Sequence, residues 1–163
     1  MSQRPHRVRM WSPKGQTPVL QYNFNWDKLS AMAGITLTSF YFRLYDGSVK
    51  TAEVIEFLEA LLRHVPGPLT IVWDRLSAHK SRATLNFVAD HKDRLCVEFL
   101  PAYAPELNPV EYIWAYWKQH TLPNVCPKDY WSLDDSARKT LKRMRRRPRL
   151  IAAFWKQADL SFD

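Results

Sequence analysis

The spacing of hydrophobic residues changes several times along the chain, and each change predicts an element of secondary structure. We interpret residues 29–35 and 38–44, with their β-branched and aromatic side chains, as two strands of a hairpin or meander. Asp46-Gly47 then predicts a turn. Apolar residues next recur at helical spacing, which predicts an amphipathic helix over 51–64 that ends at Pro66-Gly67-Pro68.

The run Leu69–Trp73 is continuously apolar, which is typical of a buried strand at the centre of a sheet. Asp74 ends this run. The rest of the pattern predicts a strand over 96–100 and helices over 80–92, 108–120, 131–146 and 150–158, with Pro148 between the last two. This order of elements predicts an α/β (or α+β) fold in which helices flank a mixed β-sheet.

The composition is that of one folded, basic domain. The 163 residues are enough for a hydrophobic core without disulfides. No apolar run approaches the ~20 residues of a membrane-spanning helix, and no apolar segment follows the basic start as in a signal peptide. The two cysteines form no C-x-x-C pair, so we expect a reducing cytoplasm and no zinc site. A net charge of +8 favours a polyanion such as DNA or RNA as the partner.

Two acidic residues occupy positions where a carboxylate can bind a ligand. Asp74 follows a strand end, where α/β sheets place ligand sites, although an Asp there also makes turns or caps the next helix. Glu111 follows Asn108 and Pro109, a good helix start, so it falls at the capping-box position. The same position holds a carboxylate on a rigid turn near the helix dipole, which suits a metal ligand. The two interpretations of Glu111 do not exclude each other.

The segment around Glu111 carries an unusual series of residues. They are Leu100, Pro101, Tyr103, Pro105, Leu107, Asn108, Pro109, Glu111, Trp114 and Lys118. This series resembles a motif of the DDE transposases, in the bacterial insertion-sequence branch of the mariner-like superfamily. In that family an apolar strand end is followed by Pro-x-Tyr-x-Pro-x-Leu-Asn-Pro-x-Glu, then by a Trp on the helix and a Lys one turn later. The resemblance implies an RNase H-like catalytic core.

Two segments upstream are similar to the same family. Val72-Trp73-Asp74, with His79 five residues after the Asp, looks like the family's second-Asp motif, although Arg75 stands where the family often has Asn. Between Asp74 and Glu111 lie 36 residues, close to the usual spacing of the family. Residues 11–18 resemble the Trp-x-Pro-x-Gly-x-x-Pro turn between the first two core strands.

The resemblance implies metal-dependent DNA chemistry. In this family three carboxylates bind two Mg²⁺ or Mn²⁺ ions, one activating the attacking water or 3′-hydroxyl and the other stabilising the leaving oxygen. Asp74 would be the second of these ligands and Glu111 the third. The implied function is cleavage of transposon ends and strand transfer into target DNA. The implied setting is the bacterial cytoplasm near the nucleoid, with a homodimer as the form that pairs two ends.

The first carboxylate of the triad is not where the resemblance places it. The family carries it on a strand just ahead of the turn at Trp11, but residues 1–10 contain no acidic residue, and Asp27 and Asp46 follow that turn. We therefore expect the chain to start just after the first catalytic strand, which leaves an unpaired sheet edge. We also expect the family's helix-turn-helix DNA-binding region to be missing. A truncated reading frame, a decayed element or a misassigned start would each produce this.

Basic residues are the candidates for contact with DNA. Residues 121–163 carry ten Lys and Arg against five Asp, and we interpret them as a helical extension of the same domain whose catalytic core spans 1–120. Such runs suit phosphate contact, although a solvated helix face also explains them. His79 also suits a surface or capping position. The candidate DNA contacts are His79, Lys80, Lys118, Arg138, Lys142, Arg145, Arg146 and Arg149.

Three functions stay open on the sequence. The first is a transposase catalytic domain that is inactive alone, because the loss of one of three anionic ligands weakens the binding of both metals. The second is a non-catalytic DNA-binding remnant of a transposase that uses the basic tail. The third, a generic RNase H-like nuclease, is weaker because the Asn108-Pro109-x-Glu111 segment is so typical of the transposase family.

Overall fold

The first two strands form a hairpin. The computed structural model describes residues 11–16, 29–121 and 129–160. Within them β1 (Leu29–Ile35) pairs antiparallel with β2 (Phe40–Asp46), and the Thr36 N–H donates a hydrogen bond to the Ser39 carbonyl at 2.8 Å across the turn. The predicted hairpin is confirmed. The second strand begins two residues later than expected because Thr38 and Ser39 lie in the turn.

A parallel strand pair and two helices follow along the chain. Helix α1 (Thr51–His64) has the bounds that its apolar spacing predicts, and the Glu53 carboxylate accepts the Lys50 N–H at its start, at 2.8 Å. β3 (Leu69–Trp73) then pairs in parallel with β4 (Leu95–Phe99), and α2 (Arg82–Asp90) connects the two strands. A parallel pair requires such a crossover because its strands enter from the same end.

Three helices complete the described chain. α3 (Pro109–Tyr116) follows a 3₁₀ turn (Pro105–Leu107) and continues into a π-helical turn (Trp117–Thr121). After it come α4 (Tyr130–Arg145) and α5 (Pro148–Gln157). α5 begins at Pro148, two residues before the predicted start, because proline has no N–H to leave unpaired at the first position of a helix.

These three helices pack against the hairpin around one apolar core. Ile113 of α3, Leu141 of α4 and Ile151 of α5 are all fully buried there. The Trp155 indole N–H donates to the Thr36 carbonyl at 2.8 Å, which ties α5 to the hairpin turn. α4 and α5 thus share the core that positions α3, and the domain division at residue 120 stays a prediction.

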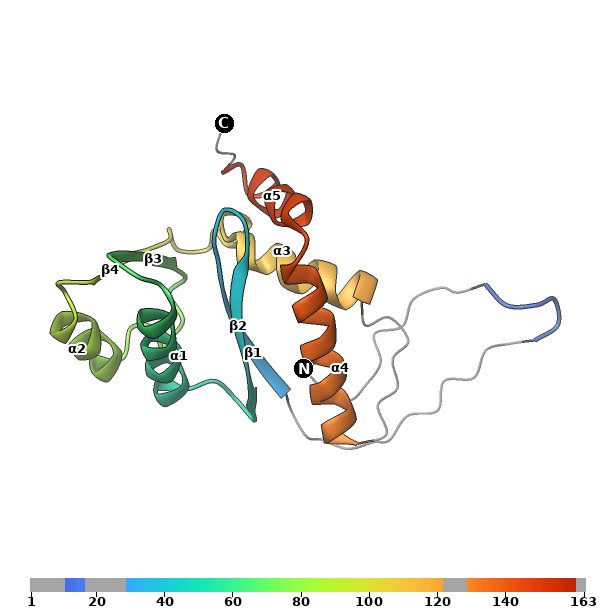
Figure 1. Ribbon diagram of the computed structural model, residues 1–163, viewed down its shortest axis with the longest axis horizontal. Helices are drawn as coiled ribbons and strands as arrows, with labels where there is room; N and C mark the ends of the chain where they lie inside the picture. The colour runs from blue at the N-terminus through green and yellow to red at the C-terminus, as the bar shows by residue number, and fades with distance from the viewer. Residues whose placement is uncertain (1–10, 17–28, 122–128, 161–163) are drawn as a thin grey trace.

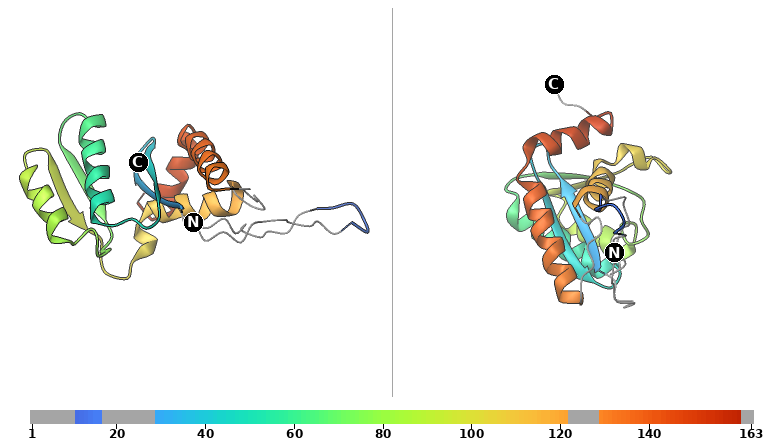
Figure 2. Two further views of the ribbon diagram at one scale, coloured as in Figure 1. Left: turned by 90° about the horizontal axis from the view of Figure 1, so that it is seen from below. Right: turned by 90° about the vertical axis from the view of Figure 1, so that its right-hand side faces the viewer.

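The molecule has two parts that lie side by side (Figures 1 and 2). In one, α1 and α2 lie beside the β3–β4 pair, with a core around Leu58, Trp73 and Leu95. In the other, α3, α4 and α5 lie beside the β1–β2 hairpin. The predicted α/β class with flanking helices is confirmed. No helix among the described residues is long and apolar enough to cross a membrane.

The position of β3 corrects one prediction. Its apolar run predicted a strand buried at the centre of a mixed sheet, but within the described ranges β3 pairs with β4 alone and Val72 is 59% exposed. The parallel and antiparallel pairs form separate two-stranded sheets there. A strand becomes central only when a second strand satisfies its other edge, and no described residue does so for β3.

The N-terminal turn is described in part. Gly15 has a φ of 85°, and the Gln16 N–H donates to the Pro13 carbonyl at 3.0 Å, which confirms the turn expected there. Residues 1–10, which would precede this turn, lie outside the described residues, as does Asp27.

Candidate active site

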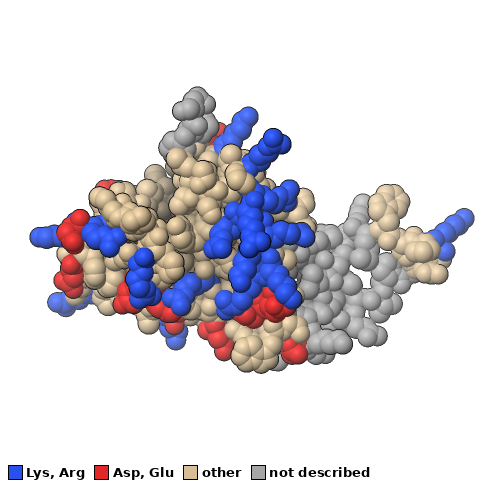
Figure 3. Space-filling view, viewed as in Figure 1, with Lys and Arg blue, Asp and Glu red and all other residues tan. Residues whose placement is uncertain are grey.

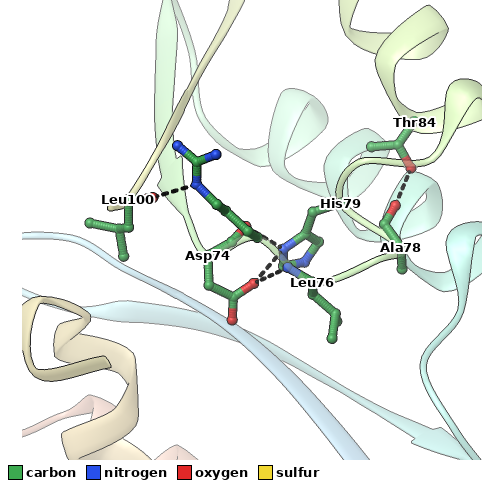
Figure 4. A network of polar contacts seen from close by, with 7 residues as sticks. Asp74, Leu76, Ala78, His79, Thr84 and Leu100 are labelled. Carbon is green, nitrogen blue, oxygen red and sulfur yellow. Dashed lines mark hydrogen bonds and ion pairs between the residues drawn. The ribbon is translucent and has the colours of Figure 1, made fainter. Parts of the chain in front are cut away.

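Asp74 is the first residue after β3, and the turn that follows fixes its carboxylate. Oδ1 accepts the Leu76 N–H at 2.9 Å and lies 2.9 Å from His79 Nδ1 (Figure 4). Oδ2 has no hydrogen-bond or ion-pair partner in the described part of the chain. The side chain is 52% exposed. Asp74 is therefore a turn residue that still presents one free carboxylate oxygen.

His79 is held beside Asp74 rather than pointing freely into solvent. Its ring stacks on the Trp73 indole, with centroids 4.4 Å apart and planes 4° from parallel. Its Nδ1 also lies 3.2 Å from the Asp74 carbonyl, and its side chain is only 13% exposed. The ring thus fixes one carboxylate oxygen of Asp74 and covers the end of β3.

The loop after β4 starts directly beside Asp74. The Leu100 N–H donates to the Trp73 carbonyl at 2.8 Å, and the Leu100 carbonyl accepts from Arg75 Nε at 3.0 Å. Farther along this loop Tyr103 is fully exposed and has a φ of 59°, a left-handed backbone that costs a non-glycine residue energy. These two bonds fix the start of the loop that leads to Glu111.

Glu111 lies on the first turn of α3. The Asn108 side chain accepts the Val110 N–H at 3.2 Å, which confirms Asn108 as the helix cap. The Asn108 N–H, which a capping box would pair with Glu111, instead donates to the Pro105 carbonyl at 3.0 Å. Among the described residues the exposed Glu111 carboxylate has no hydrogen-bond or ion-pair partner. The capping interpretation therefore applies to Asn108, and the carboxylate of Glu111 is left free.

Asp74 and Glu111 line the same groove. The groove has a volume of about 630 Å³ and runs between β1 and β3, with α1 and α3 also contributing to its walls. Most of its lining is apolar, and the polar residues of the lining are Thr36, Tyr41, Thr70, Asp74, His79, Asn108 and Glu111. The two carboxylates that the sequence singled out thus line one groove, one from each part of the molecule.

A third acidic ligand is not present beside them in the described chain. Asp74 and Glu111 are the two acidic residues that line the groove, and residues 11–16, 29–121 and 129–160 contain no group of three or more His, Cys, Asp or Glu placed to hold a metal. Asp46 ends β2 and does not line the groove. Carboxylate oxygens are the ligands that hard cations such as Mg²⁺ and Mn²⁺ prefer.

Sequence comparison identifies the family. Residues 1–134 match the family described as DDE superfamily endonuclease. The chain belongs to this DDE endonuclease family. No curated protein matches it.

Solved structures with the same fold include those of Mos1 mariner transposase. The Mos1 paired end complex with Mn is 20% identical, with a TM-score of 0.68 over 96% of this chain. The Mos1 strand transfer complex is 18% identical, with a TM-score of 0.66 over 95% of this chain. This chain spans 48% of each of those chains, about half their length. The isolated Mos1 catalytic domain matches with a TM-score of 0.62 at 17% identity, over 82% of this chain and 76% of that one. At these identities the likeness confirms the predicted RNase H-like fold.

The basic residues of this DDE family member gather along α4 and the start of α5 (Figure 3). We call this surface the basic face. It consists of the exposed residues Arg138, Lys139, Lys142, Arg143, Arg146 and Arg149. Lys142, Arg143, Arg146 and Arg149 have no hydrogen-bond or ion-pair partner within the described ranges, so their charges are open to a polyanion.

The other predicted DNA contacts are in different surroundings. Arg138 donates to the Asp134 carboxylate at 2.5 and 3.0 Å, and this bond raises the pKa of Arg138. The guanidinium of Arg145 lies 5.9 Å from the centre of the Phe42 ring, where it packs on the hairpin. Lys80 and Lys118 are exposed, and neither lies on α4 or α5. Contact between any of these residues and DNA stays a prediction.

Two residues of the site have roles that the sequence did not reveal. In the sequence Arg75 is only a departure from the family motif. In the structure its hydrogen bond to the Leu100 carbonyl links the turn after β3 to the loop after β4. Trp73 was expected only as an apolar strand residue, yet it carries the stacked His79 ring. An aromatic residue six positions before a histidine is a weak signal, and only the turn between them brings the rings together.

We expect His79→Ala to lower the free energy of unfolding by about 1–2 kcal/mol, because it removes a stacked ring pair and a hydrogen-bonded contact with Asp74. Urea unfolding followed by tryptophan fluorescence measures this change. Lys80→Ala is the control, because Lys80 is exposed and its replacement should change stability by less than about 0.5 kcal/mol. Equal stability of the two variants would show that His79 does not anchor the site.

Proposed function

We propose that this chain forms part of a transposase catalytic domain that cuts DNA strands and transfers transposon ends, with Asp74 and Glu111 as metal ligands. The observation that carries the proposal is the pair of free carboxylates on one groove, supplied by a strand end and a helix start. Membership of the DDE superfamily endonuclease family supports it. The fold similarity to the Mos1 strand transfer and paired end complexes supports it too.

The donor set fits Mg²⁺ or Mn²⁺. Both are hard cations that prefer carboxylate oxygens and keep open positions for water or phosphate. Mos1 structures with each of these metals support the same choice for this chain. Asp74 would bind through Oδ2, because Oδ1 is occupied by Leu76 and His79, and Glu111 would bind from the rigid first turn of α3.

The residues of this chain would hold and orient the site. When bound, the metal ions would activate the attacking oxygen and stabilise the leaving one. His79 and the Leu76 N–H fix the Asp74 carboxylate, so that its free oxygen keeps one direction. The Asn108 side chain, which accepts the Val110 N–H, fixes the first turn of α3 and thereby the position of Glu111. Arg75 links the two carboxylate-bearing segments at Leu100.

We further propose that two carboxylates do not support efficient cleavage. Two divalent ions bring four positive charges, and Asp74 and Glu111 offset only two of them. A third acidic ligand would have to reach the groove for both ions to bind well. On this basis the chain alone has little or no nuclease activity.

DNA is the proposed partner, and the basic face is its proposed second contact. The exposed, unpaired charges of Lys142, Arg143 and Arg146 lie within two turns of one helix, so they can follow a phosphate backbone. His79, Lys80 and Lys118 would contact DNA near the carboxylates. Transposon-end and target DNA, a homodimer, and a location at the bacterial nucleoid belong to the same proposal.

The second candidate is a DNA-binding remnant without catalysis. It is favoured because no third acidic residue lines the groove with Asp74 and Glu111 within residues 11–16, 29–121 and 129–160. Metal dependence separates the two candidates: DNA binding that ignores both Mg²⁺ and substitutions at Asp74 and Glu111 supports the remnant.

We expect this chain to nick supercoiled DNA in Mg²⁺ or Mn²⁺ no faster than its Asp74→Ala and Glu111→Ala variants. The reason is the incomplete set of ligands around the groove. A gel assay of plasmid nicking over a series of metal concentrations measures this. Robust cleavage that either substitution abolishes would contradict the expected inactivity, and it would establish the two carboxylates as catalytic.

We expect the double substitution Lys142→Ala/Arg146→Ala to weaken DNA binding and to lower the slope of log affinity against log salt by about 2, roughly one per lost phosphate contact. Fluorescence anisotropy with a labelled duplex at several salt concentrations measures the slope. Arg82→Ala/Lys92→Ala removes the same charge from the exposed surface at the two ends of α2 and serves as the control. If the two pairs change the slope equally, the basic face has no special role.

A further inference from the structure

The guanidinium of Arg75, the residue directly after Asp74, is held in place on one side. Its Nε donates a hydrogen bond to the Leu100 carbonyl at 3.0 Å. Its Cζ lies 5.9 Å from the centre of the Phe99 ring, which is within the range of a cation–π contact. Phe99 and Leu100 are themselves fixed, because Phe99 pairs with Trp73 and the Leu100 N–H donates to the Trp73 carbonyl. The guanidinium therefore keeps one position at the end of β3.

The other side of the same guanidinium is free. Within residues 11–16, 29–121 and 129–160, its terminal nitrogens Nη1 and Nη2 have no hydrogen-bond or ion-pair partner, and the residue is exposed. The N–H groups of a guanidinium form a planar fork, of which Nε uses one N–H for the Leu100 carbonyl. The remaining N–H groups are open to a ligand.

Arginines elsewhere in the described chain lack this combination of a fixed position and free terminal donors. Arg43 is paired with Glu56 at 2.8 Å, so its charge is already offset. Arg94 donates to three main-chain carbonyls at the end of α1. Arg146 on the basic face is free, but no contact in the described ranges fixes its side chain. A side chain that is ordered beforehand loses less conformational entropy when it binds a ligand.

A phosphate is the ligand that suits this fork best. Two N–H groups of a guanidinium can bond two oxygens of one phosphate in parallel, which gives both charge pairing and a fixed geometry. The surroundings also call for a positive charge, because Asp74 and Glu111 on the groove repel a phosphate when no metal is bound. Arg75 supplies that charge from the residue next to Asp74.

We propose that Arg75 binds a phosphate of the DNA backbone next to the carboxylate pair, through Nη1 and Nη2, while Nε keeps it attached to Leu100. The inference rests on the proposed function, because it takes DNA as the partner of this end of β3. It adds a contact that needs no metal ion. DNA would therefore be held beside Asp74 before any metal binds.

The test is DNA binding by the full chain with a chelator present, measured by fluorescence anisotropy of a labelled duplex at several salt concentrations. Arg75→Gln removes the charge and the terminal fork but keeps a side chain that can donate a hydrogen bond. We expect it to weaken binding by at least about fivefold, as for the loss of a charge-assisted hydrogen bond. The slope of log affinity against log salt should fall by about 1, because one phosphate contact is lost.

Two further variants separate this contact from other effects of the substitution. Arg82→Gln removes the same charge at an exposed residue of α2 that has no partner in the described ranges, and it should change the affinity by less than about twofold. Arg75→Lys keeps the charge but not the planar fork, so it should restore the slope and only part of the affinity. Circular dichroism checks that each variant is folded, as expected for exposed positions.

Two results would overturn the inference and leave DNA as the partner of this chain. One is a loss of affinity in Arg75→Gln without any change in the salt slope, because Arg75 would then only position the loop after β4. The other is an equal effect of Arg75→Gln and Arg82→Gln, which would reflect net charge alone. The absence of DNA binding by the unsubstituted chain is a different outcome, because it would refute the proposed DNA partner and the inference together.

Discussion

The parallel pairing of β3 with β4 is the constraint on which the candidate site depends. Because Trp73 pairs with Phe99 and the Leu100 N–H bonds the Trp73 carbonyl at 2.8 Å, the loop that leads to Glu111 must start beside Asp74. The Arg75 side chain, in the turn after β3, also donates a hydrogen bond to the Leu100 carbonyl. The core around Ile113 then fixes α3 against the hairpin. Two carboxylates that are 36 residues apart in the sequence thus come to line one groove.

The sequence predicted the elements of this site well, because each depends on local chemistry. The apolar run ending at Asp74 gave the bounds of β3 correctly, and Asn108 followed by Pro109 located the start of α3. The π-helical turn after Tyr116 was missed, because helical periodicity alone does not distinguish the two helix types. The contacts of Arg75 and His79 were also beyond prediction, since both depend on how the turn after β3 folds back on the strand.

The burial of β3 was predicted wrongly because burial, unlike the bounds of a strand, depends on residues far away in the sequence. An apolar composition indicates that the side chains of a strand are suited to burial. Whether they are buried depends on which other elements pack against the strand. Val72 and the unpaired indole N–H of Trp73 are suited to surroundings that the described residues do not complete. Along this groove the described residues leave one edge each of β1 and β3 without a paired strand and supply two acidic side chains.

The central claim is that Asp74 and Glu111 both serve as ligands of one metal site, and binding of Mn²⁺ to the full chain tests it most directly. Calorimetric titration should show weak, saturable binding that Asp74→Asn and Glu111→Gln each reduce by at least about tenfold, since even outer-shell substitutions at metal sites cost that much. In the double variant the two losses of binding free energy should not add, because residues that serve one site are energetically coupled. Mn²⁺ binding that neither substitution changes would contradict the account.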